Sequence, residues 1–143
     1  MSKAILVFWS GTGNTEAMAD AIAKGVRDAG ADLTVLNVSD ADAGKAAAFD
    51  KILLGCPAMG AEVLEESEFE PFFTELETKL SGKKVALFGS YGWGDGEWMR
   101  LWEERVNDSG AVLFETGLMV NEAPDIRGLA DCEAFGKRFA QLA

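Results

Sequence analysis

The chain of 143 residues contains no histidine, only two cysteines, and 13 Lys and Arg against 24 Asp and Glu, so that its formal net charge is −11. Without histidine it lacks the commonest general base, the Ser-His and Cys-His nucleophile pairs, and the commonest ligand of transition metals. Much hydrolase chemistry is thereby excluded. The excess of acids, with no basic stripe, also excludes nucleic acid as a partner and disfavours an anionic membrane surface.

The two cysteines, Cys56 and Cys132, form no C-x-x-C motif and are too few for a zinc site or a disulfide scaffold. We interpret both as free, buried thiols in a reducing compartment, and therefore expect a cytoplasmic protein. The apolar run at residues 4–9 is too short for the core of a signal peptide, and no apolar stretch approaches membrane-spanning length.

The length predicts a single domain over residues 1–143, and 48% hydrophobic with 26% charged residues is an ordinary globular composition. Four short apolar runs have the length and bounding of buried strands, at residues 4–9, 51–56, 85–89 and 112–120, and a fifth run, at residues 33–38, alternates between apolar and polar residues. Runs that are apolar throughout indicate burial on both faces, as in a parallel sheet with helices on each side.

Segments of helical periodicity lie between these runs. Apolar stripes are present at residues 14–29, 69–80, 98–106 and 131–142, and the alanine-rich residues 41–50 predict a further short helix. Strands alternating with helices predict a three-layer, doubly wound α/β sheet of five parallel strands. Ligands of such sheets bind beyond the carboxyl ends of the strands, which makes the loops after strands one, three and four informative.

The loop after the first strand is rich in hydroxyl groups and glycine: Ser10, Gly11, Thr12, Gly13, Asn14 and Thr15. Glycines allow a tight turn with inward N–H groups, and the following helix directs its positive dipole end to the same point. The loop lacks the Lys of a triphosphate loop and the G-x-G-x-x-G of a dinucleotide site, so it predicts a cradle for one terminal phosphate. The alternative is a turn with a helix cap.

The loops after strands three and four each contain one large, polarisable side chain. Met59 lies beside Pro57, Ala58 and Gly60, and Trp93 lies beside Ser90, Tyr91, Gly92 and Gly94. Met59 and Trp93, facing one another across a cleft, would hold a flat ring between them. A packing role remains the alternative for each, above all for Met59 and Tyr91. Trp9, Trp98 and Trp102 fit core positions better, although Trp98 is also kept as a candidate contact.

Three segments, SGTGNT at 10–15, GCPAMG at 55–60 and GSYGWGDGEW at 89–98, together resemble the flavodoxins of the short-chain kind. The resemblance covers essentially the whole chain. It implies the strand order 2-1-3-4-5, with an unbroken fifth strand at 112–120. It also implies noncovalently bound FMN, and a low-potential electron carrier between redox enzymes, using the semiquinone/hydroquinone couple.

The resemblance further implies that Ser10, Thr12, Asn14, Thr15 and the loop N–H groups hold the phosphate. Met59 and Trp93 would flank the isoalloxazine, Glu62 would accept from its N3–H, and the Gly94 backbone would reach its pyrimidine edge. The Gly60 peptide would flip on one-electron reduction. Ala61 and Pro57 depart from patterns common in the family, at the flipping turn and at a possible phosphate or ribityl contact.

Two other functions remain open. An FMN-dependent reductase shares this fold, but the chain has no nicotinamide fingerprint and no histidine for proton delivery. A phosphoacceptor receiver module needs acidic residues after strand one and an Asp ending strand three, where Ser10 and Cys56 stand.

Seven glutamates and no Lys or Arg lie within residues 61–78. Either they form a solvated face, or they steer a redox enzyme with a basic docking surface toward a monomeric carrier.

Overall fold

The structure, a computed structural model, describes residues 3–142. In chain order its elements are β1 (Lys3–Phe8), α1 (Asn14–Asp28), β2 (Asp32–Asn37), a 3₁₀ turn (Val38–Asp40), α2 (Ala43–Ala46), β3 (Lys51–Gly55), α3 (Phe69–Leu76), a 3₁₀ turn (Glu77–Lys79), β4 (Lys84–Tyr91), α4 (Glu97–Asp108), β5 (Val112–Leu113), β6 (Leu118–Asn121) and α5 (Ile126–Ala140). None of the helices in this described part is long and apolar enough to cross a membrane.

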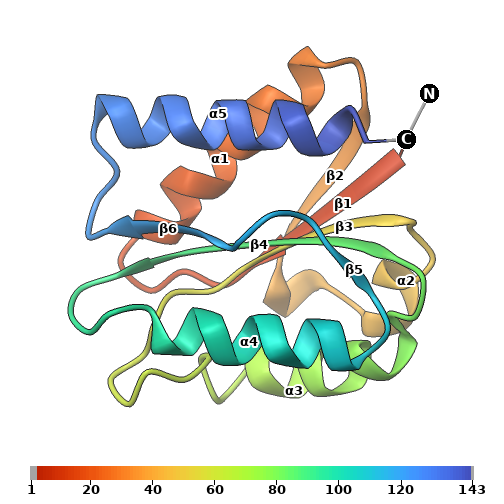
Figure 1. The fold of residues 1–143 in the computed structure, drawn as a ribbon, viewed down its shortest axis with the longest axis horizontal. Helices are drawn as coiled ribbons and strands as arrows, with labels where there is room; N and C mark the ends of the chain where they lie inside the picture. Colours follow the sequence, from red (N-terminus) through yellow and green to blue (C-terminus); the bar gives the residue numbers. More distant parts are fainter. Residues whose placement is uncertain (1–2, 143) are drawn as a thin grey trace.

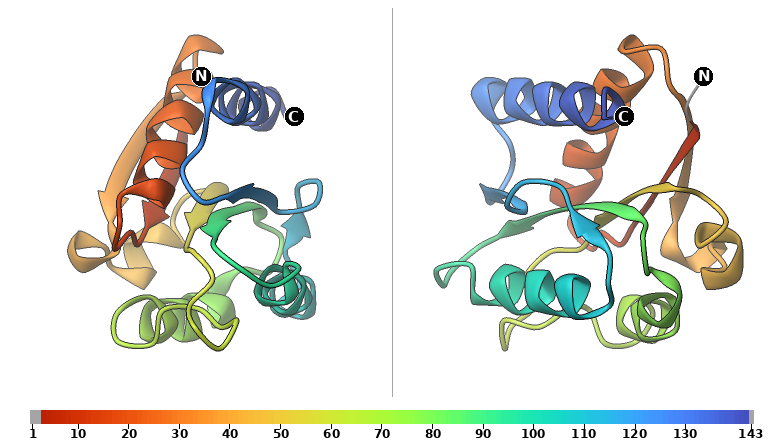
Figure 2. Two further views of the ribbon diagram at one scale, coloured as in Figure 1. Left: turned by 90° about the vertical axis from the view of Figure 1, so that its left-hand side faces the viewer. Right: turned by 45° about the vertical axis from the view of Figure 1, so that its right-hand side comes forward.

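The strands form one parallel sheet in the order β2-β1-β3-β4-β5, with β6 also pairing with β4. Helices α1 and α5 cover one face and α3 and α4 the other (Figure 1). The three layers are also visible from the side (Figure 2). The predicted doubly wound α/β fold and its strand order are confirmed. The carboxyl ends of β1, β3 and β4 therefore meet at one edge of the sheet.

Alternate side chains of β1 belong to two separate cores. Ile5 and Val7 pack with residues of α3 and α4, whereas Leu6 and Phe8 pack with residues of α1 and α5. Successive side chains of a strand point to opposite faces, and here both faces are covered. This explains why the strand is apolar at every position instead of at every second one.

The fifth strand is interrupted, so the prediction of an unbroken strand at residues 112–120 is wrong. Phe114 packs against Phe135 and Phe139 of α5, with ring centroids 5.4 and 5.3 Å apart. Glu115 has a φ of 51°. The N–H of Gly117 donates to Glu103 on α4 across 2.6 Å, instead of extending the sheet. Side-chain packing and a left-handed residue thus divide the strand into β5 and β6.

The last helix begins at Ile126, earlier than the predicted residue 131. Asp125 caps it, because its carboxylate accepts a hydrogen bond from the N–H of Gly128 across 2.8 Å. The first turn contains the exposed Ile126 and a glycine, so the apolar stripe is absent there. Helices α1 and α5 approach very closely: a Cβ on Gly25 would collide with the Glu133 carbonyl, and one on Gly136 with the Ile22 carbonyl.

Candidate functional site

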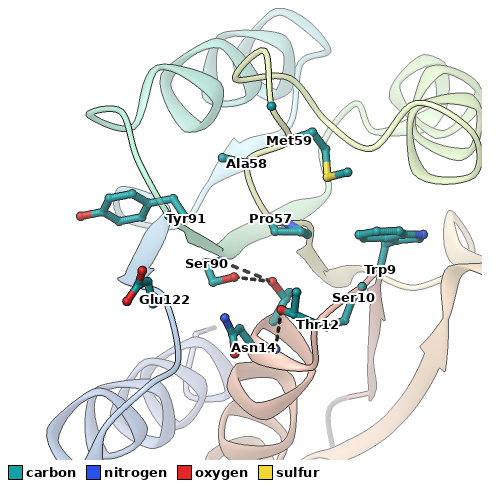
Figure 3. Close-up of a pocket in the computed structure, with 14 residues that line it drawn as sticks. Trp9, Ser10, Thr12, Asn14, Pro57, Ala58, Met59, Ser90, Tyr91 and Glu122 are labelled. Carbon is teal, nitrogen blue, oxygen red and sulfur yellow. Dashed lines mark hydrogen bonds between the residues drawn. The ribbon is translucent and has the colours of Figure 1, made fainter.

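A cavity of about 450 Å³ opens at the edge where β1, β3 and β4 end, as the topology predicts. It is bounded by the three loops singled out in the sequence and by one residue after β6 (Figure 3). Its lining residues are Trp9, Ser10, Gly11, Thr12, Asn14, Thr15, Pro57, Ala58, Met59, Gly60, Ser90, Tyr91, Gly92 and Glu122.

The loop at residues 10–15 presents free hydrogen-bond donors at the positive end of α1. Gly13 caps the helix with a φ of 96°, which favours glycine. Ser10 Oγ accepts from the N–H groups of Gly13 and Glu16 across 3.1 and 3.3 Å. Within residues 3–142, no hydrogen bond uses the N–H groups of Gly11, Thr12 and Thr15. The loop can therefore bind an anion such as a phosphate through dipoles alone.

A buried pair of hydroxyls fixes this loop to the end of β4. Thr15, which is 1% exposed, has its Oγ1 3.1 Å from Ser90 Oγ, and it also accepts from the N–H of Ser90 across 3.4 Å. The carbonyl of Ser90 in turn accepts from the N–H of Ala58 across 3.0 Å. The three loops are thus connected through Ser90, and Figure 3 shows its hydrogen bonds to the loop after β1.

The loop after β3 contains a tight turn from Met59 to Glu62. The N–H of Glu62 donates to the Met59 carbonyl across 2.8 Å, and the N–H of Met59 donates to the Val63 carbonyl across 3.0 Å. Gly60 and Ala61 occupy the two central positions, and neither has a positive φ, whereas Glu62 has a φ of 52°. The Met59 side chain reaches over the cavity on the side of Trp9 (Figure 3).

The carboxylate of Glu62 lies against Gly94 in the loop after β4. A Cβ on Gly94, whose φ is 85°, would come within 2.5 Å of Glu62 Oε1. Oε1 is buried and has no hydrogen-bond partner. A buried acceptor of this kind fits a ligand that brings a ring N–H group, and the free donors of the phosphate loop fit its anionic end. On both counts the residues present fit FMN.

The predicted candidates that do not line the cavity are Gly13, Glu62, Trp93, Gly94 and Trp98. The side chain of Trp93 is 62% exposed, so it does not face Met59 across the cavity in this structure. Trp98 is 1% exposed and donates its indole N–H to the Cys56 carbonyl across 3.1 Å. It therefore supports the loop after β3 from within the core.

Two lining residues were not among the candidates. Trp9, interpreted as core, is half-buried beside the cavity, and its indole N–H donates to Glu68 across 3.3 Å. Glu122 follows β6, and its N–H donates to the Tyr91 carbonyl across 2.7 Å. Glu122 could have been identified as a lining residue from its position at the carboxyl end of a strand beside β4. We expected lining residues only from the loops after strands one, three and four, and not from the loop after the fifth strand.

Several glutamates of the acidic segment at residues 61–78 are paired or buried, and are not all exposed to solvent as the sequence suggests. Arg105 on α4 pairs with Glu70 across 2.8 Å and with Glu77 across 3.0 Å. Its hydrogen bonds to Glu70 lower the pKa of that carboxyl despite the opposing effect of burial. Glu65 is buried and caps the start of α3, accepting from the N–H groups of Glu68 and Phe69. Glu66, Glu68 and Glu75 remain exposed.

Neither cysteine is suited to nucleophilic chemistry. Burial raises the pKa of Cys56 and that of Cys132 to about 12, so both stay protonated at neutral pH. Cys56 Sγ accepts from the N–H of Glu65 across 3.4 Å, a structural contact. Across residues 3–142, no group of three or more Cys, Asp or Glu side chains is arranged to hold a metal ion.

Comparison with known proteins gives consistent matches along nearly the whole chain. The family model described as Flavodoxin matches residues 6–136. The chain is 58% identical to a flavodoxin of Clostridium beijerinckii, over 96% of this chain and 99% of that protein. It is 53% identical to a flavodoxin of Megasphaera elsdenii, over 95% and 97%. The solution structure of the two-electron reduced Megasphaera elsdenii flavodoxin superposes with a TM-score of 0.89, at 51% identity, covering 97% of this chain and 99% of that one.

Proposed function

Because the chain belongs to the flavodoxin family, whose members bind FMN and transfer electrons, we propose that it is a one-electron carrier using the low-potential couple of FMN. Bound FMN supplies the redox chemistry, and the chain binds it, orients it and adjusts its potentials. The observation that carries the proposal is the cavity at the carboxyl ends of β1, β3 and β4, which is lined by a loop with free phosphate-type donors.

For the phosphate we propose the hydroxyls of Ser10, Thr12 and Thr15 and the amide of Asn14, together with the free N–H groups of the loop. The hydroxyl of Ser10 now accepts from two helix N–H groups, and it still has a proton to donate. With no Lys or Arg in the loop, binding depends on many oriented dipoles at the end of α1, each of modest strength.

For the flavin ring we propose that Met59 contacts the inner face and Trp93 covers the outer face. Trp93 is 62% exposed on a glycine-rich loop, so its large apolar ring is free to contact a flat ligand. Glu62 accepts from the ring N3–H, and the Gly94 backbone borders the same edge. The remaining proposed contacts are Gly11, Gly13, Pro57, Ala58, Ser90, Tyr91 and Gly92, with Trp98 acting through the loop that it supports.

We also propose that the Gly60 peptide can change orientation, so that its carbonyl oxygen would accept a hydrogen bond from a ring N–H group of FMN in the one-electron-reduced protein. A Cβ on Gly60 would meet nothing within 4 Å, so steric room does not require glycine there. The conformational freedom of glycine does, because rotating the central peptide of a turn needs a positive φ at one of its two central residues.

The exposed glutamates near the site provide two further effects. Their negative charge opposes an additional negative charge on the reduced ring, which lowers the second one-electron potential. The same charge attracts a redox enzyme with a basic docking surface. We propose that the protein acts as a single-domain monomer in the cytoplasm, where its two buried thiols stay reduced.

The test is a titration of the apoprotein with FMN, followed by stepwise reduction of the complex under anaerobic conditions. We expect saturable binding at one site, a yellow complex, and a stable one-electron-reduced form at intermediate potentials. Direct passage to the two-electron form would contradict the one-electron proposal. Gly60→Val should destabilise the one-electron form more than it weakens FMN binding, and equal losses would argue against the peptide rotation.

The enzymatic alternative, an FMN-dependent reductase, is tested separately. NADH or NADPH is added to the complex under anaerobic conditions without a partner reductase, and the flavin absorbance is followed. An electron carrier keeps its oxidised spectrum, since no nicotinamide fingerprint is present in the sequence. Rapid bleaching would identify a reductase instead.

A further inference from the structure

Trp9 lines the cavity at the strand ends, but none of the contacts proposed above uses it. Its backbone N–H donates to the Gly55 carbonyl across 3.0 Å, which continues the pairing of β1 with β3 by one residue. Its half-buried side chain packs against the core on the α3 and α4 side of the sheet, and it lies on the same side of the cavity as Ser10 and Met59 (Figure 3). The indole therefore lies where β1 passes into the loop at residues 10–15.

The six-membered ring of this indole lies directly against the backbone of Gly11. A Cβ on Gly11 would come within 2.8 Å of Cη2 and 3.2 Å of Cζ3 of Trp9. Gly11 does not have a positive φ, so its backbone conformation does not require glycine. The requirement is steric, because the ring occupies the space that a side chain at residue 11 would need.

The opposite edge of the indole is held by Glu68. The indole N–H donates to Glu68 Oε1 across 3.3 Å, although the two residues are 59 positions apart in the chain. The Glu68 side chain is exposed, but its backbone is fixed at the start of α3, since its N–H donates to the buried carboxylate of Glu65 across 2.8 Å. The indole thus connects the segment before α3 with the loop after β1.

Gly11 joins two peptide units whose N–H groups are free. These are the N–H groups of Gly11 and Thr12, which no hydrogen bond uses within residues 3–142. The loop contains no Lys or Arg, so an anion is held only if such dipoles point at it. Glycine has more backbone freedom than any other residue, and fixing it costs conformational entropy. A contact that restrains Gly11 before the ligand arrives lowers that cost.

We propose that Trp9 is a positioning residue that braces Gly11, so that the N–H groups of Gly11 and Thr12 are already oriented for a phosphate before it binds. The ring restrains the Cα between the two peptides, and Glu68 restrains the ring. The role rests on the proposed function, in which this loop holds the phosphate of FMN. Donors that are oriented in advance lose less freedom on binding, so affinity is higher. The brace acts on the phosphate end and needs no contact between Trp9 and the cofactor.

The first test uses the apoprotein in phosphate-free buffer and so does not depend on FMN. We expect ¹⁵N relaxation to give order parameters of about 0.85 for the amides of Gly11 and Thr12, and below about 0.6 in Trp9→Leu. The amide of Gly13, which donates to Ser10 Oγ, is the internal control and should stay rigid. Glu68→Ala, at an exposed side chain, should show a smaller change of the same kind. Amides of equal mobility in the three proteins would overturn the brace.

The second test compares FMN with riboflavin, which lacks the phosphate. Trp9→Leu should raise the dissociation constant of FMN about tenfold and leave that of riboflavin nearly unchanged. A general loss of stability would affect both ligands alike. An equal loss for the two ligands would place Trp9 against the ring or the ribityl chain, and an unchanged FMN affinity would show that the loop needs no brace. Either result would refute the positioning role.

The third test isolates the hydrogen bond between the indole and Glu68. Glu68→Ala removes the acceptor and should raise the dissociation constant of FMN about threefold, as expected for one partly exposed hydrogen bond. Glu68→Gln removes the same charge, but its amide oxygen still accepts from the indole, so its affinity should be close to that of the wild type. Equal affinities of the two variants would refute the contribution of Glu68.

The fourth test is a double-mutant cycle on the contact between Trp9 and Gly11. Gly11→Ala should weaken FMN binding, because the added methyl group collides with the ring. The same substitution should have a smaller effect in Trp9→Leu, where the ring is absent. Additive effects of the two substitutions would contradict the contact.

These experiments separate the inference from the proposed function. If the wild-type apoprotein does not bind FMN, the proposed function fails, and the relaxation measurements still decide whether Trp9 restrains Gly11. If FMN binds but neither its affinity nor the mobility of Gly11 changes in Trp9→Leu, the proposed function stands and the positioning role of Trp9 is refuted.

Discussion

The carboxylate of Glu62 lies against the backbone of Gly94, so closely that a Cβ on Gly94 would come within 2.5 Å of Glu62 Oε1. Two loops that are remote in sequence are therefore in contact beside the proposed flavin edge. The contact requires a glycine for two reasons, the φ of 85° and the lack of room for a side chain.

Gly94→Ala should lower FMN affinity by more than tenfold, because the added methyl group displaces the Glu62 carboxylate. It should also destabilise the apoprotein by about 1–2 kcal/mol, the cost of a left-handed backbone for a residue with a Cβ. Gly30→Ala is the matched control, since Gly30 has a φ of 90° and nothing within 4 Å of its Cβ position. Urea unfolding and FMN titration check both; equal FMN affinities in the two variants would contradict the Glu62 contact.

Thr15→Val and Thr12→Val should separate support of the phosphate loop from phosphate binding. Thr15 is buried and bonded to Ser90, so its loss should cost the apoprotein about 1–3 kcal/mol and weaken FMN binding as well. Thr12 is exposed and accepts only a long bond of 3.4 Å from the N–H of Asn14, so its loss should weaken FMN binding with little change in unfolding.

Riboflavin, which lacks the phosphate, is the control ligand for this pair. Thr12→Val should leave riboflavin affinity nearly unchanged if its hydroxyl binds the phosphate. An equal loss of affinity for FMN and riboflavin would place Thr12 elsewhere in the site. Calorimetric titration of the two ligands measures the difference.

Glu65→Gln should destabilise the apoprotein at pH 7 by about 1.5–3 kcal/mol, because an amide cannot accept at both ends. One carboxylate oxygen accepts from the N–H groups of Glu68 and Phe69 across 2.8 and 2.9 Å, and the other accepts from Ser67. Burial alone would raise the pKa of Glu65, but these hydrogen bonds outweigh it and lower the pKa below its usual value of 4.5.

The pH dependence follows from that direction. A lowered pKa in the folded state means that Glu65 stabilises the fold above about pH 4.5, and that this contribution is lost as the pH falls through the folded pKa. The difference between wild type and Glu65→Gln should therefore shrink in acid. Glu66→Gln, at the exposed neighbouring residue, should show no such difference in urea unfolding at pH 7. A constant difference down to pH 3 would contradict the assignment.

Electron transfer to a basic redox enzyme should slow as ionic strength rises, because salt screens the attraction between exposed charges. The structure limits which glutamates contribute, since Arg105 pairs with both Glu70 and Glu77 and its charge offsets one of their two negative charges. Glu66→Gln and Glu75→Gln should reduce the salt dependence, whereas Glu70→Gln should mainly affect stability. Stopped-flow rates between 20 and 500 mM salt test this, and a flat salt profile would refute steering.

The sequence predicted the fold because its strongest signals are local and repeated. Strands such as β1 are apolar at every position since two cores need them, and the helices have stripes at helical spacing. The loop at residues 10–15 could be identified as a candidate anion site for a similar reason, because its glycines and hydroxyls are contiguous. These features depend on little beyond the neighbouring residues in the chain.

What could not be predicted depends on contacts between distant residues. The break in the fifth strand follows from the packing of Phe114 on α5 and from the bond between Gly117 and Glu103. Trp9 and Trp98 are both aromatic residues at the ends of apolar segments, and only the assembled loops show that Trp9 borders the cavity while Trp98 is enclosed. The ion pair between Glu70 and Arg105 could likewise not be predicted, because the two residues are remote in sequence.

The close approach of α1 and α5 has a consequence for synthesis on the ribosome. Gly25 and Gly136 let the two helices meet backbone to backbone, and the buried Lys51 at the start of β3 donates to the carbonyls of Ala140 and Leu142. The part of this face that α1 does not cover stays exposed until α5 has emerged from the exit tunnel. The core on this side of the sheet is therefore completed only when the last helix packs against α1 and the strands.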